Sequence, residues 1–257
     1  MTVIYDYGQY TVNSKSVHLK WLEAHIDDVT VRNVGDKTCG NSGYYGINGT
    51  FFSFGTNNNP CDSGDSNDLI GIAIQNGSSV KFAGHQNVYN LSSGRGTLVR
   101  LINNLQDGTF IFEKKFQSFP TTQNGYTVNQ SNVKWAVGGI SLLLGQTLTE
   151  SGYNSAISGE SPPAVSTDRP RTAIGYKGGN KVILCAIFDG DELWNGGIGY
   201  GCNLWDVRTI MKDKFGCTMG VNLDGGGSTQ ISYKLNGQNY YHQTESRCIQ
   251  SMITVPM

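Results

Sequence analysis

The sequence predicts an α+β protein with a mixed, mostly antiparallel twisted sheet flanked by a few helices, and three observations support this prediction. Short apolar runs recur along the chain, and turn-forming pairs such as Asn76-Gly77 and Asp107-Gly108 separate them, which is typical of β-hairpins. Only residues 202–216 show clear helical periodicity. Glycine accounts for 34 of 257 residues, about double the average usage of roughly 7%, as expected for many turns between short strands.

The first half of the chain contains most of the short apolar runs. Residues 17–21 alternate apolar and polar side chains, which predicts a half-buried strand, and residues 44–52 form an aromatic run interrupted by glycines. Residues 57–68 lack periodicity and are predicted to form a surface loop. The stretches 69–82 and 97–112 each contain two apolar runs around one of the turn pairs and are predicted to be hairpins.

The second half continues with strands at 133–146 and 171–190, followed by the predicted helix at 202–216. Asn203 is a suitable helix N-cap, and Gly216 suits the left-handed position at the C-terminal end. The apolar residues on one face of this helix are Leu204, Val207, Ile210 and Met211.

No linker or internal repeat divides the chain. The Ser/Pro-rich residues 155–170 resemble a linker, but strand-like sequence resumes directly after them, which favours a mobile loop within one domain. The sequence therefore predicts a single domain over residues 1–257, with its core at about 17–257.

The charge pattern excludes two classes of partner. The net charge is −1 and charged residues make up 15% of the chain, so no basic surface is expected for nucleic acid or for an anionic membrane. No apolar stretch is long enough to span a bilayer, and residues 1–12 lack the features of a signal peptide. We expect an extracellular or virion-associated protein whose leader has been removed or was never present. The oligomeric state remains open.

The cysteine count favours an oxidising compartment. The number is even, and neither a CxxC pair nor a Cys/His cluster at zinc spacing occurs. The local pairs Cys39–Cys61 and Cys202–Cys217 are plausible disulfides, and buried free thiols are the alternative. The six residues are Cys39, Cys61, Cys185, Cys202, Cys217 and Cys248.

A glycine triplet next to one carboxylate is the first candidate site. In residues 222–229, NLDGGGST, Asp224 precedes three glycines and two hydroxyl residues. Successive glycine N–H groups can form an anion-binding nest, and a tight hairpin turn is the alternative. The predicted ligand-binding residues are Gly225, Gly226, Gly227, Ser228 and Thr229.

Three other stretches place polar residues at predicted strand ends. Asn48 lies in GINGTFF, Arg169 and Arg171 precede a strand in DRPRTAIGY, and Asp189 ends one in AIFDGD. We expect these side chains to face a common cleft. Asn48 and Asp189 could also be structural or turn residues, and Arg171 could form a surface ion pair. The four histidines share no pattern with Asp or Ser that would indicate a catalytic triad.

Taken together, GINGTFF, RPRTAIGY, DGD…GYGCNLWDV and NLDGGGST resemble the phosphodiester glycosidase family in order and spacing, over roughly residues 17–257. This resemblance implies hydrolysis of a sugar linked through its anomeric carbon to a phosphodiester, with Asn48, Arg171, Asp189 and Asp224 at the family's motif positions. Asp191 stands where the family often has arginine, which leaves the phosphate contacts and the substrate open.

The chemistry of these residues fits that reaction. Arg171 could bind two phosphate oxygens at once, and glycosyl transfer to water normally uses two carboxyl groups, here Asp224 as base or nucleophile and Asp189 as its partner. The sequence requires no cofactor and leaves a divalent cation open. A bacterial wall polymer, teichoic acid or exopolysaccharide is the expected substrate, and a non-catalytic glycan- or phosphate-binding or adhesion module of a phage tail or cell wall is the alternative.

Overall fold

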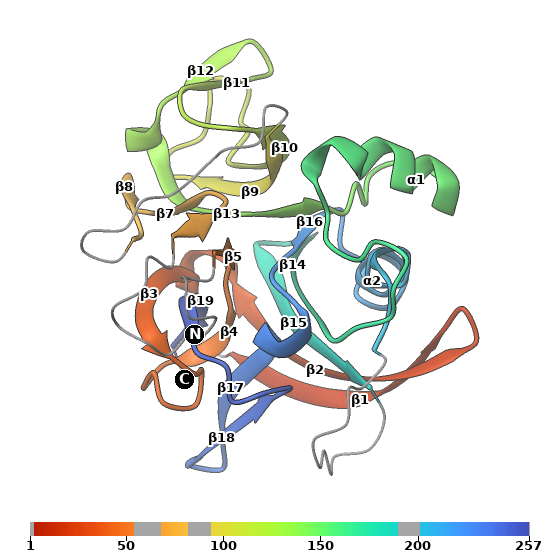
Figure 1. The fold of residues 1–257 in the computed structure, drawn as a ribbon. Helices are drawn as coiled ribbons and strands as arrows, with labels where there is room; N and C mark the ends of the chain where they lie inside the picture. The colour runs from red at the N-terminus through yellow and green to blue at the C-terminus, as the bar shows by residue number, and fades with distance from the viewer. Residues whose placement is uncertain (1–2, 54–67, 82–93, 190–200, 257) are drawn as a thin grey trace.

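The computed structural model describes residues 3–53, 68–81, 94–189 and 201–256. Within these residues two antiparallel sheets dominate (Figure 1). The larger, ten-stranded sheet consists of β1 (Ile4–Val12), β2 (Lys15–His25), β7 (Ala73–Gln75), β8 (Ser78–Ser79), β9 (Arg95–Leu101), β10 (Ile111–Phe116), β13 (Val133–Ser141), β14 (Arg171–Gly178), β15 (Lys181–Asp189) and β16 (Met219–Asn222).

The smaller sheet has five strands in the order β18-β17-β4-β19-β3, and two further pairs of strands form separate two-stranded sheets. The five strands are β3 (Thr30–Lys37), β4 (Tyr45–Asn48), β17 (Gln230–Leu235), β18 (Gln238–Gln243) and β19 (Ile249–Val255). The two further pairs are β5 (Phe51–Phe52) with β6 (Leu69–Ile70), and β11 (Thr121–Gln123) with β12 (Tyr126–Val128).

The helical segments are few and short. The two α-helices are α1 (Glu150–Ile157) and α2 (Leu204–Thr209), and α2 continues as one π-helical stretch, Ile210–Lys214. Short 3-10 turns occur at Ile26–Asp28, Gln130–Asn132, Ser158–Glu160 and Gly226–Ser228.

Strand β13 organises the ten-stranded sheet. Along one edge it pairs with β9, and along the other it pairs first with β7 and then, at Ile140 and Ser141, with β16. The order then runs β16-β14-β15-β2-β1, so the chain's N-terminal strand forms that edge of the sheet. Every strand pairing among the described residues is antiparallel, so the predicted sheet is antiparallel rather than mixed.

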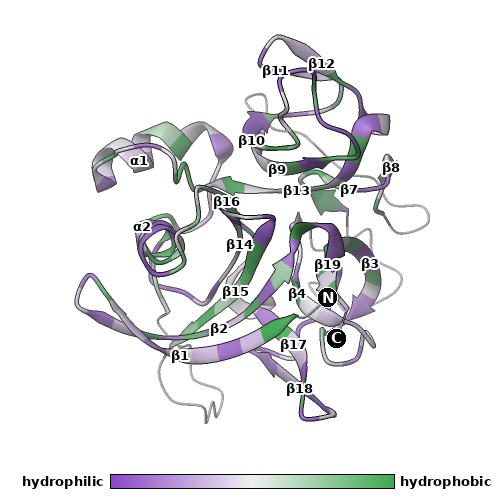
Figure 2. Ribbon diagram, turned by 180° about the vertical axis from the view of Figure 1, so that it is seen from behind, coloured by the Kyte–Doolittle hydropathy of each residue, from purple (hydrophilic) through white to green (hydrophobic). Residues whose placement is uncertain are grey.

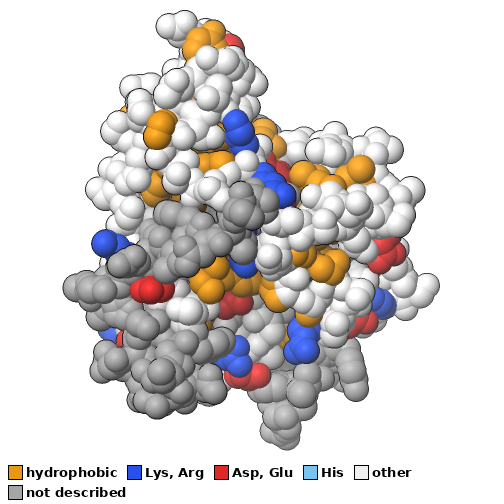
Figure 3. Space-filling view, turned by 45° about the horizontal axis from the view of Figure 1, so that its top comes forward, with side chains coloured by type: hydrophobic (Ala, Val, Ile, Leu, Met, Phe, Trp, Pro, Cys, Tyr) orange, Lys and Arg blue, Asp and Glu red, His pale blue; other side chains and the backbone are white. Residues whose placement is uncertain are grey.

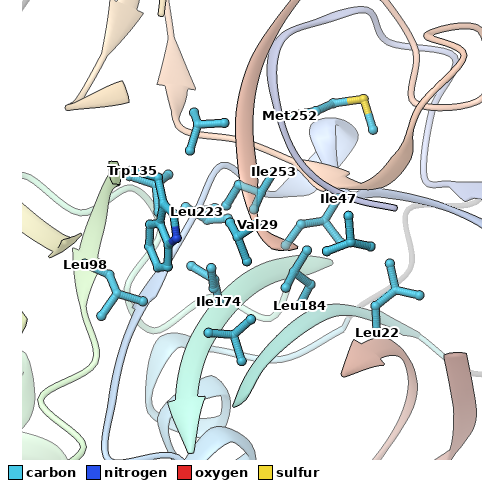
Figure 4. Packing of buried hydrophobic residues seen from close by; sticks show 14 of the residues in the cluster. Leu22, Val29, Ile47, Leu98, Trp135, Ile174, Leu184, Leu223, Met252 and Ile253 are labelled. Carbon is cyan, nitrogen blue, oxygen red and sulfur yellow. The ribbon is translucent and has the colours of Figure 1, made fainter. Parts of the chain in front are cut away.

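The alternation of side chains along the strands creates two apolar layers. On one face of the large sheet, Ile174 and Leu184 pack with Ile47 and Ile253 of the smaller sheet (Figure 4). On the opposite face, Ala173 packs with α2 residues in a second cluster. Neighbouring residues of a strand point to opposite faces, which is why single strands serve both layers. Figure 2 shows this alternation as green and purple bands along the strands.

Several local predictions are confirmed. The Asn76-Gly77 turn joins β7 to β8, and both residues have positive φ angles, of 48° and 74°, as a two-residue hairpin requires. Strands β9 and β10 pair around the connection that contains Asp107-Gly108. The helix at 202–216 is also present: the Asn203 side chain accepts a hydrogen bond from the Asp206 amide, and Gly216 has a φ of 68°.

Two local predictions are wrong. Helix α1 was not expected, because its eight residues include glycine and serine and carry only two buried residues, Tyr153 and Ile157. Residues 155–170 were predicted to be one mobile loop, but α1 extends to Ile157 and a 3-10 turn follows, with a buried Glu160. That carboxylate accepts hydrogen bonds from the Gly96 and Ser141 amides, both at 2.9 Å, and so ties the segment to β9 and β13.

Both named disulfide pairs are wrong as well. Cys39, Cys202 and Cys217 are buried free thiols, as is Cys185. Burial raises the pKa of all four, for Cys217 to about 12. The predicted loop 57–68 lies outside the described residues except for Asp68, as does Cys61.

Candidate functional site

The glycine loop carries the chain from one sheet to the other. Strand β16 lies between β14 and β13 in the large sheet and ends at Asn222, and β17 of the smaller sheet begins at Gln230. The connection contains Asp224 and the 3-10 turn Gly226–Ser228. Strands fixed in both sheets therefore hold the two ends of this loop, and Asp224 lies where the sheets meet.

Each of the three glycines is required for a different structural reason. Gly226 has a φ of 60°, a conformation that disfavours side chains. A Cβ on Gly225 would come within 2.9 Å of the Pro170 carbonyl oxygen, and one on Gly227 would come within 2.3 Å of Glu245 Oε2. Close approach of the surrounding chain thus explains the triplet.

The glycine amides do not form the open anion nest that the sequence suggested. The Gly225 amide donates to Asp224 Oδ1 at 2.9 Å, and the Gly226 amide donates to the Pro170 carbonyl at 2.8 Å. The amides of Ser228 and Thr229 donate to carbonyls of the same turn. These bonds rigidify the loop and occupy the backbone amides of Gly225, Gly226, Ser228 and Thr229.

Asp224 is a half-buried carboxylic acid with a perturbed pKa. Burial raises the pKa of Asp224 to about 6, against the opposing effects of the Ser228 hydroxyl, the Gly225 amide and the positive charges of Arg247 and Arg95. The Ser228 hydroxyl lies beside this carboxyl but forms no well-aligned hydrogen bond with any described group. A carboxyl that titrates near neutral pH can both accept and release a proton in catalysis.

Asn48 fixes the position of Asp224. Its Nδ2 donates to the Asp224 carbonyl at 2.8 Å, and its Oδ1 accepts from Thr172 Oγ1 at 2.7 Å and from the Gln230 amide at 3.1 Å. Asn48 is only 1% exposed. One side chain at the end of β4 therefore connects β14, the glycine loop and β17, and this geometry makes Asn48 a positioning residue.

The Arg171 guanidinium forms its hydrogen bonds with backbone carbonyls of the protein. Its Nε donates to the Cys202 carbonyl at 3.0 Å, and its Nη2 donates to the carbonyls of Ala164 and Thr167 at 2.6 and 2.8 Å. Three of the five guanidinium N–H donors therefore bind backbone, and the residue is 3% exposed. The expected bidentate contact with phosphate does not match this arrangement, in which Arg171 anchors the segment before β14.

Asp189 is the last residue of β15, where its backbone pairs with Val17. Its side chain lies outside the described part of the structure, as do Gly190 and Asp191. The structure therefore leaves its expected role beside Asp224 untested.

Sequence reasoning missed Arg95, at the start of β9. Its guanidinium lies over the Phe51 ring, with Cζ 4.5 Å from the ring centroid. Its Nε and Nη1 atoms are buried and have no hydrogen-bond partner among the described residues. Burial lowers the pKa of Arg95, and the negative charges of Glu160 and Asp224 oppose this shift. An arginine between two glycines, in Gly94-Arg95-Gly96, was the only sequence signal that could have drawn attention to it.

Arg247 and Glu245 were missed too. They form an ion pair, Arg247 Nη2 to Glu245 Oε2 at 2.9 Å, and they lie against Gly227. On the coloured part of the face shown in Figure 3, basic and acidic side chains lie intermixed on a mostly uncharged surface. The described residues on this face form no continuous basic track of the kind that nucleic-acid binding requires.

The described residues contain no group of three or more His, Cys, Asp or Glu side chains placed to hold a metal ion. Neither of the helices found in them has the length and apolar character needed to cross a membrane.

Residues 41–255 match the family model described as phosphodiester glycosidase. None of the curated proteins matches the sequence.

Three solved structures have a similar fold. One is the zebrafish N-acetylglucosamine-1-phosphodiester alpha-N-acetylglucosaminidase catalytic domain auto-inhibited by its pro-peptide, with 17% identity, a TM-score of 0.59 and coverage of 100% of this chain and 83% of that chain. A hypothetical protein from Synechocystis shows 12% identity, a TM-score of 0.56 and coverage of 98% and 62%. A putative exported protein from Burkholderia pseudomallei shows 14% identity, a TM-score of 0.54 and coverage of 95% and 75%.

Proposed function

Because this chain belongs to the phosphodiester glycosidase family, we propose that it hydrolyses the link between the anomeric carbon of a sugar and a phosphodiester. The observation that supports this most directly is Asp224, a half-buried carboxyl with a pKa raised to about 6. It lies in a loop locked between two sheets by Asn48. Such preorganisation is what a reacting carboxylate requires.

In this proposal the ionised Asp224 is the base or nucleophile. A phosphate leaving group departs as a stable anion, so protonation of the leaving oxygen contributes less than it does in ordinary glycoside hydrolysis. One carboxylate can then be sufficient for the chemical step, with Asp189 orienting water or sugar hydroxyls. Asn48 and Arg171 hold the framework, and neither is assigned a contact with the reacting atoms.

The proposed natural substrate is a bacterial wall polymer, teichoic acid or exopolysaccharide, and the proposed location is outside the cell or on a virion. The supporting observations are the family, the low charge of the chain and its wealth of Asn, Ser, Thr and Tyr. A polar surface of this kind suits the hydroxyl groups of a glycan.

The test is release of free N-acetylglucosamine from UDP-N-acetylglucosamine, comparing the wild type with Asp224→Asn and with Asp107→Asn. Asp107 is a carboxylate in the exposed β9–β10 connection and serves as the matched control. We expect Asp224→Asn to reduce kcat by several orders of magnitude and Asp107→Asn to leave it unchanged. Equal turnover in folded Asp224→Asn would refute the assignment, and tight glycan binding without turnover in the wild type would favour the adhesion module.

The bond that breaks can be established in oxygen-18 water. If the anomeric C–O bond breaks, the label appears in the sugar, whereas P–O cleavage places it in the phosphate. The role proposed for Asp224 at the anomeric carbon requires the first result.

A further inference from the structure

The Arg95 guanidinium interacts with Asp224 through its charge, and the described part of the fold leaves two of its nitrogen atoms without hydrogen-bond partners. Its Nε and Nη1 are buried without a partner among the described residues. Buried polar atoms are almost always hydrogen-bonded in folded proteins, because losing water without a replacement is costly. Two such donors on one guanidinium are therefore available to an acceptor that a ligand supplies.

The surroundings of Arg95 hold it in one orientation. The Phe51 ring supports the guanidinium from one side at 4.5 Å, and Phe51 lies only three residues after Asn48, which binds the Asp224 carbonyl. On the backbone side, the Gly96 amide donates to Glu160. A Cβ on Gly96 would come within 2.5 Å of the Ser141 nitrogen, so the strand carrying Arg95 lies tightly against β13.

The two other arginines near the glycine loop are engaged. Arg171 donates to three backbone carbonyls, and Arg247 forms an ion pair with Glu245. Glu160, whose negative charge acts on Arg95, accepts two backbone amides through Oε2. Among these three arginines, Arg95 alone keeps buried donors unsatisfied.

We propose that Arg95, seated on Phe51, binds the non-bridging oxygens of the substrate's phosphodiester and places the anomeric carbon beside Asp224. This inference rests on the proposed function. A planar guanidinium can meet two phosphate oxygens together, and a lysine ammonium cannot. The aromatic face restricts the guanidinium to one plane, which lowers the entropy lost on binding. The preference of the site for substrates with a negatively charged aglycone over substrates with an uncharged one therefore derives from Arg95.

The matched control is Arg100, five residues further along β9. Its guanidinium also lies over a phenylalanine, with Cζ 5.0 Å from the Phe110 centroid. Its Nε is also buried without a partner among the described residues, but unlike in Arg95 its Nη1 and Nη2 are both bonded, to the Leu101 carbonyl at 2.5 Å and to Asp27 at 3.2 Å. Arg100→Gln thus removes a comparable side chain from the same strand without touching the site.

The kinetic experiment measures kcat/KM of Arg95→Gln, Arg95→Lys and Arg100→Gln on two substrates. The aglycone of UDP-N-acetylglucosamine is negatively charged in the bound substrate, and that of 4-nitrophenyl α-N-acetylglucosaminide is uncharged there. We expect Arg95→Gln to lose about ten- to a hundredfold on the first, the range for charge-assisted hydrogen bonds, with less than about threefold change on the second. Arg95→Lys should recover only part of the loss, and Arg100→Gln should match the wild type on both.

A binding experiment makes the inference independent of turnover. UDP is titrated calorimetrically into the wild type and the Gln variants, all shown to be folded by circular dichroism. Weaker binding to Arg95→Gln alone supports the phosphate contact even if no glycoside is hydrolysed, in which case the proposed function fails and this inference stands. Equal affinity for UDP in all three proteins, or an equal loss on both glycosides, overturns it.

Discussion

Removing the Asn48 side chain tests whether one amide holds the site together. Asn48→Ala deletes hydrogen bonds to the Asp224 carbonyl, the Thr172 hydroxyl and the Gln230 amide, at 2.8, 2.7 and 3.1 Å. A neutral hydrogen bond contributes about 0.5–1.5 kcal/mol net, so the three together contribute about 1.5–4.5 kcal/mol to the free energy of unfolding. For a chain of this size the Tm should fall by on the order of 10 °C.

The same change should reduce activity in protein that is still folded. With its carbonyl released, Asp224 can shift, and a displacement of about 1 Å can cost roughly a hundredfold in rate. Urea unfolding gives the stability, and steady-state kinetics on UDP-N-acetylglucosamine give kcat.

Thr172→Val is the graded control for Asn48→Ala. It removes only the 2.7 Å bond to Asn48 Oδ1 and leaves the contacts of Asn48 with Asp224 and Gln230 intact. We expect about one third of the destabilisation and a much smaller effect on kcat. If Asn48→Ala unfolds within about 0.5 kcal/mol of the wild type, the three bonds are not a structural connection and the reasoning fails.

The remaining predictions concern Asp224, Arg171 and Gly226. Because the pKa of Asp224 is raised to about 6 and its ionised form is the proposed reactant, kcat/KM should fall as pH drops through about 6; a flat profile from pH 5 to 8 would contradict this. The raised pKa of Asp224 also stabilises the folded state: this contribution is complete below the unfolded pKa of about 3.9 and is lost as pH rises through about 6. Asp224→Asn should therefore raise the free energy of unfolding at pH 8 and change it little at pH 4. Urea titrations at the two pH values measure this difference. Arg171→Lys should lower the Tm, because an ammonium cannot replace the guanidinium geometry at three carbonyls; an unchanged Tm by calorimetry would show those bonds to be dispensable, and Arg169→Lys is the milder control. Gly226→Ala should destabilise the protein by about 1 kcal/mol, the cost of a left-handed conformation with a Cβ, measured by urea unfolding, and no loss would mean that the turn relaxes.

Local features were predictable because they depend on neighbouring residues. A type I′ hairpin requires two residues that tolerate positive φ, and Asn76-Gly77 supplies them. The helix at 202–216 has its own cap, Asn203, and its own terminator, Gly216. The family resemblance predicted that Asn48 belongs to the same site as the glycine loop. It did not predict the three hydrogen bonds that Asn48 forms there.

The two named disulfide pairs were wrong because sequence spacing does not measure distance in space. Cys202 and Cys217 bracket a nearly continuous helical segment, which rises about 1.5 Å per residue and separates its ends. Both side chains instead belong to the apolar layer beneath that helix. Short separation along the sequence therefore gave the wrong pairs, and the alternative of buried free thiols holds for Cys39, Cys185, Cys202 and Cys217.

The sequence by itself determined the strands, the main turns, the capped helix and the carboxylate in the glycine loop, because hydrophobic periodicity and φ preferences act over a few residues. Only the tertiary structure decided which arginine is available to a ligand. Arg171 lost that role because backbone carbonyls from residues 164, 167 and 202 converge on it. Arg95 gained it because β9 places its guanidinium on Phe51, more than a hundred residues before Asp224. Hydrogen-bond satisfaction is a property of atoms brought together by packing, and no pattern along one strand encodes it.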